Sequence, residues 1–371
     1  MWHRVILLVG GAAMLLTGLD AALLRLGLPA PVQGAEIGQM HGPLMVYGFL
    51  TTLISLERAV ALRAVVARSG WGYAAPAAGV LGGLLLIAGV AGAPIPGQLL
   101  AGAAWAAACT LLLTIYIVMW HAQPSAALGI QMIGAVAGIG GAALWARGLA
   151  IPQIFPWWAV LLVLTIGGER LDLARLAFQG RLERQIMGWA GLVLLTLPLT
   201  LLTPGLGYAA LGFMLAVLMA DLVTHDIARH TIHGHGAAQL MAACMLGGYA
   251  WAFLAALSWL AAGPVYSGYR YDFTVHAITL GFVVSMILAH APVIVPAIVH
   301  RELPYHPVLW AVWGLLQAGL IVRVAGGFRD AIGAWHFGGA LDVMALLALL
   351  GCVVGLVLSS GTRRTATRAR R

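Results

Sequence analysis

The stretch YDFTVHAITLGFVVSMILAHAPVIVP, residues 271–296, decides the fold class of this chain. It is apolar and long enough to cross the ~30 Å hydrocarbon core of a membrane as one helix. It carries His276 and His290, which lie about 40° apart around a helix and roughly 21 Å apart along its axis. Ionisable residues inside a membrane cost free energy and mark candidate functional sites. The stretch therefore predicts a membrane helix with one histidine near each side of the hydrocarbon layer.

The composition places the whole chain in the same class. Of its 371 residues, 62% are hydrophobic and 9% are charged, which excludes an ordinary soluble domain. All 20 basic residues are arginine, and they lie mostly in short connections beside apolar runs. The net charge of +8 therefore does not predict nucleic-acid binding; the partner we expect is the lipid bilayer. The three cysteines lie in apolar runs without a CxxC spacing, so we expect no disulfide and no structural zinc.

Twelve apolar runs predict an all-α membrane protein with about twelve transmembrane helices in one polytopic domain, residues 1–371. The first run has no convincing cleavage site and is interpreted as an uncleaved helix. A short basic tail follows at 361–371. The predicted spans are 5–28, 41–62, 72–93, 98–120, 126–146, 156–178, 186–203, 205–228, 237–262, 272–298, 307–325 and 336–360.

Arginine bias predicts the orientation of these spans. With both termini on one side, that side holds 15 arginines and the other side holds 5. The positive-inside rule then places both termini in the cytoplasm. In this topology the second and tenth spans run in the same direction. His41 and His276 then lie at similar depth near the outer surface, whereas His225, His230, His233 and His290 lie near the cytoplasmic side.

His41 and His276 are the first candidate site. A bis-histidine haem needs one imidazole from each of two facing helices at matched depth, which the predicted topology provides. Gly42, Gly48 and Gly281 are small enough to let a flat macrocycle approach the backbone. The pair predicts a haem b between the second and tenth helices. An ordinary hydrogen-bonding role for each histidine is the alternative.

The sequence around His41 adds a family resemblance. His41-Gly42-x-x-Met45 resembles the H-G-x-x-M stretch of haem–copper oxidase subunit I, where this histidine ligates a low-spin haem with a partner on the tenth helix. Ile278 stands where the oxidases have a second tenth-helix histidine, and the sixth and seventh spans lack the copper histidines, so the oxidase active site is not carried over.

The chain more nearly resembles the NnrS family, twelve-span bacterial haem- and copper-containing proteins linked to nitric oxide metabolism. The likeness rests on the second span and on HAITLGFVVSMILAH at 276–290. It implies an oxidase-like bundle in a bacterial-type inner membrane and a role in electron transfer or in small-gas binding.

A second histidine group lies at and after the eighth span. His225, His230 and His233 have spacings that suit copper, another transition metal or a second haem, and His290 could add a ligand from the same side of the membrane. The alternative is a solvated cytoplasmic loop, which Gly234 and Gly236 favour towards its end.

Charged residues near the cytoplasmic end of the sixth span form a third group. Glu169 and Asp172 share a helix face, and Asp172 could pair with Arg175. Glu169 is interpreted as a proton relay or as an acceptor for a histidine, and Arg170 as a partner for a haem propionate. An internal ion pair that orders helix packing is the alternative.

Three functions remain open at this stage. The first is a haem protein that transfers electrons, or that binds or turns over a small gas such as nitric oxide, with a possible redox partner. The second is a twelve-span proton-coupled secondary transporter, although the two halves show no convincing repeat. The third is a sensor or assembly protein that holds haem without catalysis, so whether the chain is an oxidoreductase is left undecided.

Overall fold

The computed structural model describes residues 2–34, 36–173 and 180–368, and these residues form helices and connections without a β-strand. In chain order the helices are α1 (Trp2–Arg25), η1 (Ile37–Met40), α2 (His41–Pro43), η2 (Leu44–Thr51), α3 (Thr52–Val65), η3 (Gly70–Tyr73), α4 (Ala74–Val90), α5 (Gly97–Ala122), α6 (Ala126–Ala146), α7 (Ile151–Leu173), α8 (Arg181–Leu202), α9 (Pro204–His225), α10 (Ala228–Thr231), α11 (Gly236–Ala262), α12 (Gly268–His276), η4 (Ala277–Val284), α13 (Ser285–Val299), α14 (Val308–Phe328) and α15 (Ile332–Arg368).

Twelve helical spans in the described part of the chain are long and apolar enough to cross a membrane, which confirms the predicted number. Three of the spans are built from consecutive helical segments: 37–65, 70–90 and 268–299. A helix satisfies its own backbone hydrogen bonds, so each apolar run can enter hydrocarbon without exposing unpaired N–H and C=O groups. The predicted sixth span extended to residue 178, and its last residues lie outside the described part. The predicted basic tail continues α15 to Arg368, and residues 369–371 also lie outside it.

The described chain divides into two compact units. Unit 1 comprises Met1–Leu222 and Ala256–Ser267, and unit 2 comprises Val223–Ala255 and Gly268–Arg371. His41 therefore belongs to unit 1, and His276 belongs to unit 2.

Small residues bring consecutive helices of unit 1 close together. A methyl group added at Gly134 of α6 would lie 3.1 Å from the carbonyl oxygen of Leu161 in α7, and one at Gly138 would lie 3.0 Å from the Leu161 side chain. Tyr47 of η2, in another span, donates a hydrogen bond to the carbonyl of Gly138 at 2.9 Å. The small-residue spacing at 134–142 thus predicts helix packing correctly.

Replacing Gly134 with leucine should destabilise unit 1 by about 1–3 kcal/mol, because the new side chain has to displace the α7 backbone. The thermal unfolding temperature in detergent would measure this loss. Gly188→Leu on α8 is the matched control, since a side chain at Gly188 meets nothing within 4 Å. Equal unfolding temperatures for the two variants would contradict the close α6–α7 contact.

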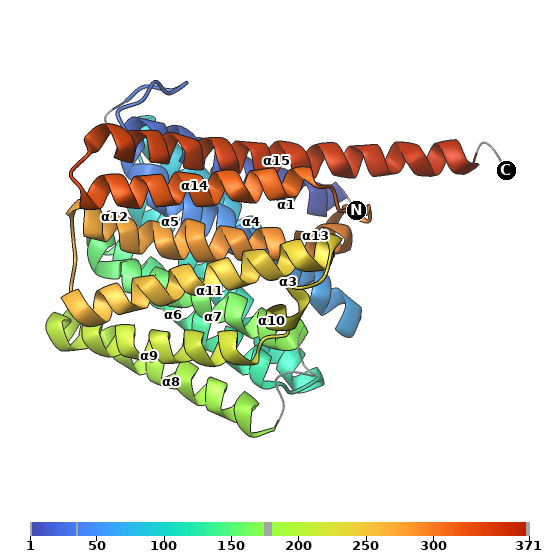
Figure 1. Cartoon of the computed structure of the whole chain (residues 1–371), viewed down its shortest axis with the longest axis horizontal. Coiled ribbons are helices and arrows are strands. Elements are labelled where there is room, and N and C mark those ends of the chain that lie inside the picture. Colours follow the sequence, from blue (N-terminus) through green and yellow to red (C-terminus); the bar gives the residue numbers. More distant parts are fainter. Residues whose placement is uncertain (1, 35, 174–179, 369–371) are drawn as a thin grey trace. The chain divides into compact units, whose positions relative to one another are not determined.

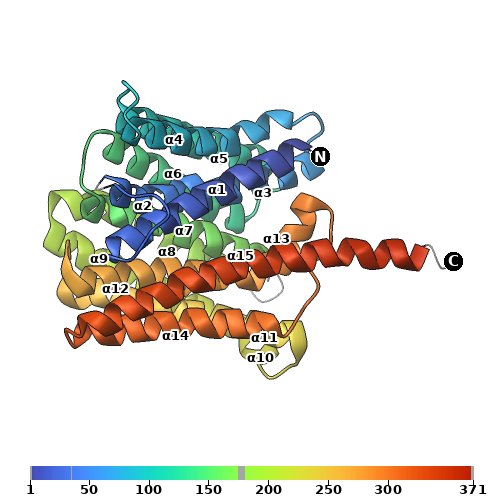
Figure 2. The ribbon, with the colours of Figure 1, turned by 90° about the horizontal axis from the view of Figure 1, so that it is seen from above.

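In unit 2, α14 and α15 run side by side in both views (Figures 1 and 2). Glycines permit their contact: a methyl group at Gly338 of α15 would collide with the backbone of Arg323 in α14, and one at Gly319 would lie 2.5 Å from Oδ1 of Asp342. This close approach sets Arg323 and Asp342 at facing positions of two neighbouring membrane helices.

Both helices that carry the predicted haem ligands contain a wide helical segment. The π-helix η2 begins three residues after His41, and the π-helix η4 begins directly after His276; each has eight residues. The hydroxyls of Thr51 and Thr52 donate to carbonyls five residues earlier, at 2.9 and 3.3 Å, as the wider winding requires. Single-turn π-bulges are the usual form of this conformation and frequently occur at functional sites.

Candidate functional site

His41 opens the second span and is oriented by the first helix. Its Nδ1 lies 2.8 Å from the carbonyl oxygen of Gly18 in α1. A carbonyl oxygen only accepts hydrogen bonds, so Nδ1 carries the proton and donates. The lone pair of the neutral ring is then on Nε2, which is the tautomer that can ligate a metal through Nε2.

His276 ends α12 and is oriented within its own helix. Its Nδ1 lies 2.8 Å from the carbonyl oxygen of Asp272 and 3.2 Å from Oδ1 of the same residue. The imidazole is therefore in the same tautomer as that of His41, with a carboxylate beside the protonated nitrogen. A carboxylate in this position raises the basicity of a ligating imidazole.

Asp272 is itself held by two other helices. Arg323 of α14 donates from Nε to Oδ2 at 2.8 Å and from Nη2 to Oδ1 at 2.6 Å. Trp335 of α15 donates its indole N–H to Oδ2 at 2.9 Å, and the Arg323 guanidinium lies 5.3 Å from the Trp335 ring centroid. A two-point arginine–carboxylate contact is directional, so it determines where Asp272, and through it His276, can lie.

Asp342 is the second carboxyl beside Arg323. It lies in α15 with 2% of its surface exposed, and its Oδ2 is 3.6 Å from Nη1 of Arg323. That distance is too long for a hydrogen bond. One guanidinium in unit 2 therefore faces two carboxyl groups, but it donates hydrogen bonds to only one of them.

Sequence reasoning did not single out Asp272, Arg323 or Asp342. Arg323 is 7% exposed and lies five residues before the end of α14, so it is a buried residue of a membrane span. The sequence does show ionisable residues within apolar spans, and such residues need partners on other spans. The sequence does not say which span provides each partner.

A polar group on the neighbouring helices adjoins η4. Ser285, the first residue of α13, accepts hydrogen bonds from Trp313 Nε1 and Gln317 Nε2, both at 3.2 Å. Gln317 accepts in turn from Trp251 Nε1 at 2.7 Å. These hydrogen bonds connect α11 and α14 to the first residue of α13, where the π-helix η4 ends.

Unit 1 contains a charge cluster around Arg58 of α3, which is 5% exposed. The guanidinium pairs with the neighbouring Glu57, and its Nη2 lies 2.5 Å from Oε2 of Glu169 in α7. Gln131 of α6 donates to the same Glu169 oxygen at 3.2 Å. The ion pair between Arg58 and Glu169 links α3 to α7, and the hydrogen bond from Gln131 adds α6. This arrangement corresponds to the alternative in which Glu169 belongs to an internal ion pair that orders helix packing. Arg170 is buried and Asp172 is half-buried, while the suggested partner Arg175 lies outside the described residues.

The other four candidate histidines occupy different environments. His225, His230 and His233 are exposed at the end of α9 and around α10, and Nδ1 of His225 lies 3.1 Å from the hydroxyl of Thr224. His290 is buried in α13, with 3% of its surface exposed. Across residues 2–34, 36–173 and 180–368, no three or more His, Cys, Asp or Glu side chains form a group that could hold a metal ion.

The three glycines expected to face a macrocycle instead accommodate neighbouring helices. A methyl group at Gly281 would collide with Trp251, one at Gly48 would lie 3.1 Å from Met14, and one at Gly42 would lie 3.3 Å from Trp158. In this structure the space beside these three glycines is filled by neighbouring side chains. Their small size serves aromatic and methionine packing.

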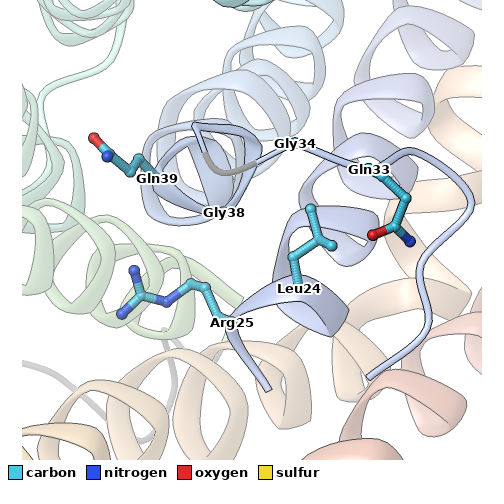
Figure 3. A pocket seen from close by; sticks show the side chains of 6 residues that line it. All are labelled: Leu24, Arg25, Gln33, Gly34, Gly38 and Gln39. Atoms are coloured by element: carbon cyan, nitrogen blue, oxygen red, sulfur yellow. The ribbon is translucent and has the colours of Figure 1, made fainter. Parts of the chain in front are cut away.

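A cavity of about 400 Å³ opens near the start of the His41 span. Figure 3 shows Arg25 at the end of α1 and Gln39 directed to the same side, with Gln33 on the other side of Leu24. Gly34 and Gly38 complete its lining. Three polar side chains thus line this cavity, and one of them, Gln39, stands two residues before His41 in the sequence.

These features define a multi-pass helical membrane protein with buried charge clusters in both units. The chain belongs to the family described as a domain of unknown function, DUF8744, whose model matches residues 4–358. Comparisons with curated proteins and with solved structures found no match to this chain.

Proposed function

We propose that the chain is a haem-binding membrane protein in which His41 and His276 would hold haem b. The observation that carries the proposal is the orientation of the two imidazoles. Each donates from Nδ1 to a backbone carbonyl at 2.8 Å, and each is therefore in the tautomer that ligates iron through Nε2. A π-helix follows each of them within three residues.

The two proposed ligands are oriented by different groups. Gly18 orients His41 through a neutral carbonyl, whereas Asp272 adds a carboxylate to the support of His276. Arg323 and Trp335 hold that carboxylate in place. A haem held by two imidazoles would supply one-electron transfer. We infer electron transfer, or binding or turnover of a small gas such as nitric oxide, as in the NnrS-like proteins that the sequence resembles.

The proposal includes the oxidase-like bundle with cytoplasmic termini. It is supported by the order of the spans, since the two histidines lie in the second and tenth of twelve. Arg58, Arg170 and Arg323 are buried within helices and do not belong to connections. When Arg58 and Arg170 are left out on the side of the termini and Arg323 on the other side, the number of arginines falls from 15 to 13 and from 5 to 4. The counts still favour the same orientation.

A proton-coupled secondary transporter is the second candidate, and one observation favours it. In each unit a buried arginine faces two carboxyl groups within membrane spans: Arg58 with Glu57 and Glu169, and Arg323 with Asp272 and Asp342. Carboxyls in such positions are typical of proton pathways. A transporter would need these carboxyls and would not need haem.

A reduced-minus-oxidised visible spectrum of the purified protein, from cells supplied with a haem precursor, tests the first proposal. We expect a low-spin b-type spectrum in the wild type and its loss in both His41→Ala and His276→Ala. His336→Ala is the matched control, because His336 is a partly buried histidine of α15 outside the proposed ligand pair.

Two results would contradict this assignment. A well-folded wild type without haem would exclude the haem function and leave the transporter. Haem that persists in both histidine variants would show that the ligands are other residues, with His225 and His290 the next pair to replace.

A further inference from the structure

Asp342 is a deeply buried carboxyl without hydrogen bonds. Its side chain is 3% exposed, and within the described residues neither of its oxygens has a hydrogen-bond partner. Oδ1 faces the backbone of α14 at Gly319, where even a methyl group would not fit. Ionised carboxylates in apolar surroundings need hydrogen bonds or a paired cation to offset the loss of water.

Arg323, which lies beside Asp342, is already paired with another carboxyl. Arg323 gives both of its short hydrogen bonds to Asp272, which also accepts from Trp335. Charged groups face Asp342 from two elements: Arg323 on α14 and, behind it, Asp272 on α12. If both carboxyls were ionised, the cluster would carry a net negative charge inside a membrane span. A proton on Asp342 removes that charge without disturbing the Arg323–Asp272 pair.

We propose that Asp342 is a proton-binding site inside the membrane span and that Arg323 couples it to Asp272. While both short hydrogen bonds of Arg323 go to the Asp272 carboxylate, Arg323 does not hydrogen-bond to Asp342, and Asp342 keeps its proton. In the variant Asp272→Asn the guanidinium, whose Nη1 lies 3.6 Å from Oδ2 of Asp342, is free to pair with it. The Asp342 O–H bond would then break, the proton would pass to water, and the carboxylate would pair with Arg323.

This inference goes beyond the proposed haem site and holds whether or not haem is bound. It assigns unit 2 a buried carboxyl that holds a proton inside a membrane span. The two proposals fail independently, because the haem spectrum does not report on Asp342 and the measurement below does not require haem.

Infrared spectroscopy at neutral pH, in a detergent without ester groups, tests the proposal. We expect a carboxylic-acid carbonyl band above the amide bands. It should shift in heavy water and when the protein contains aspartate labelled with ¹³C at the side-chain carboxyl. The band should disappear in Asp342→Asn. It should also disappear in Asp272→Asn, where Arg323 becomes the partner of an ionised Asp342.

Asp226→Asn is the matched control. Asp226 is 1% exposed in the same unit, but its oxygens accept from Ala228 N and from the Tyr249 hydroxyl, both at 2.8 Å, as an ionised carboxylate does. The band should keep its full intensity in this variant. If Asp342→Asn does not fold, Asp342→Glu replaces it: the band should then remain but no longer respond to labelled aspartate.

The absence of a label-sensitive band in the wild type would overturn the proton site. Its persistence in Asp342→Asn, or its response to labelled aspartate in Asp342→Glu, would do the same. Full intensity in Asp272→Asn would overturn the coupling through Arg323.

Discussion

Arg323→Leu is expected to lower the free energy of unfolding by about 3–5 kcal/mol, the usual cost of removing one partner of a buried ion pair. The change leaves Asp272 without its two hydrogen bonds from the guanidinium, at 2.6 and 2.8 Å, inside a membrane span. It also removes the contact with the Trp335 ring. Denaturant-induced unfolding in detergent micelles would measure the loss.

Two further variants show whether the loss comes from the ion pair. Arg329→Leu removes an exposed arginine one residue after α14 and should change stability by no more than about 0.5 kcal/mol. Arg323→Leu combined with Asp272→Asn should recover much of the loss, because no uncompensated charge remains at Asp272. A double variant as unstable as Arg323→Leu alone would show that the arginine acts through packing.

Arg58→Leu is expected to have a comparable effect in unit 1, again about 3–5 kcal/mol, because it leaves two carboxylates without their cation. Glu57 and Glu169 both contact this guanidinium, and Glu169 reaches it from a different helix. The loss should therefore loosen the α3–α7 contact as well as destabilise the protein. Amide hydrogen exchange of α3 and α7, measured beside the unfolding curve, would report both effects.

Arg63→Leu provides the comparison on the same helix, since Arg63 is exposed in the last turn of α3. Adding Glu169→Gln to Arg58→Leu should restore only part of the stability, because Glu57 remains charged. Complete recovery would mean that Glu57 is solvated and does not depend on Arg58. No loss in Arg58→Leu would remove the ion-pair interpretation of Glu169.

The sequence identifies the two candidate histidines, but it does not show how their imidazoles are oriented. A histidine in an apolar span is visible in the sequence, and both His41 and His276 were recognised on that basis. Their tautomers were not predictable, because the acceptors are a carbonyl of the preceding helix in one case and a carbonyl one turn earlier in the other. The π-helices were not predictable either, since LMVYGFLT and AITLGFVV have the composition of ordinary membrane helices.

The sequence by itself determined the class of protein, the number of spans and most of their boundaries. The physical reason is that membrane insertion depends on the length and polarity of each segment, and both are local properties. The same reasoning identified the small-residue face at 134–142 as a packing surface, because close helix approach requires the absence of side chains there.

Only the tertiary structure decided which charges meet. Glu169 was considered with Asp172 and Arg175 of its own segment, but its partner Arg58 comes from another span, and Arg323 joins carboxyls from two spans on either side of its own. A buried charge takes whichever opposite charge the packing brings within reach. That choice depends on helix rotation and on glycine contacts such as Gly319 with Asp342, which no single segment specifies.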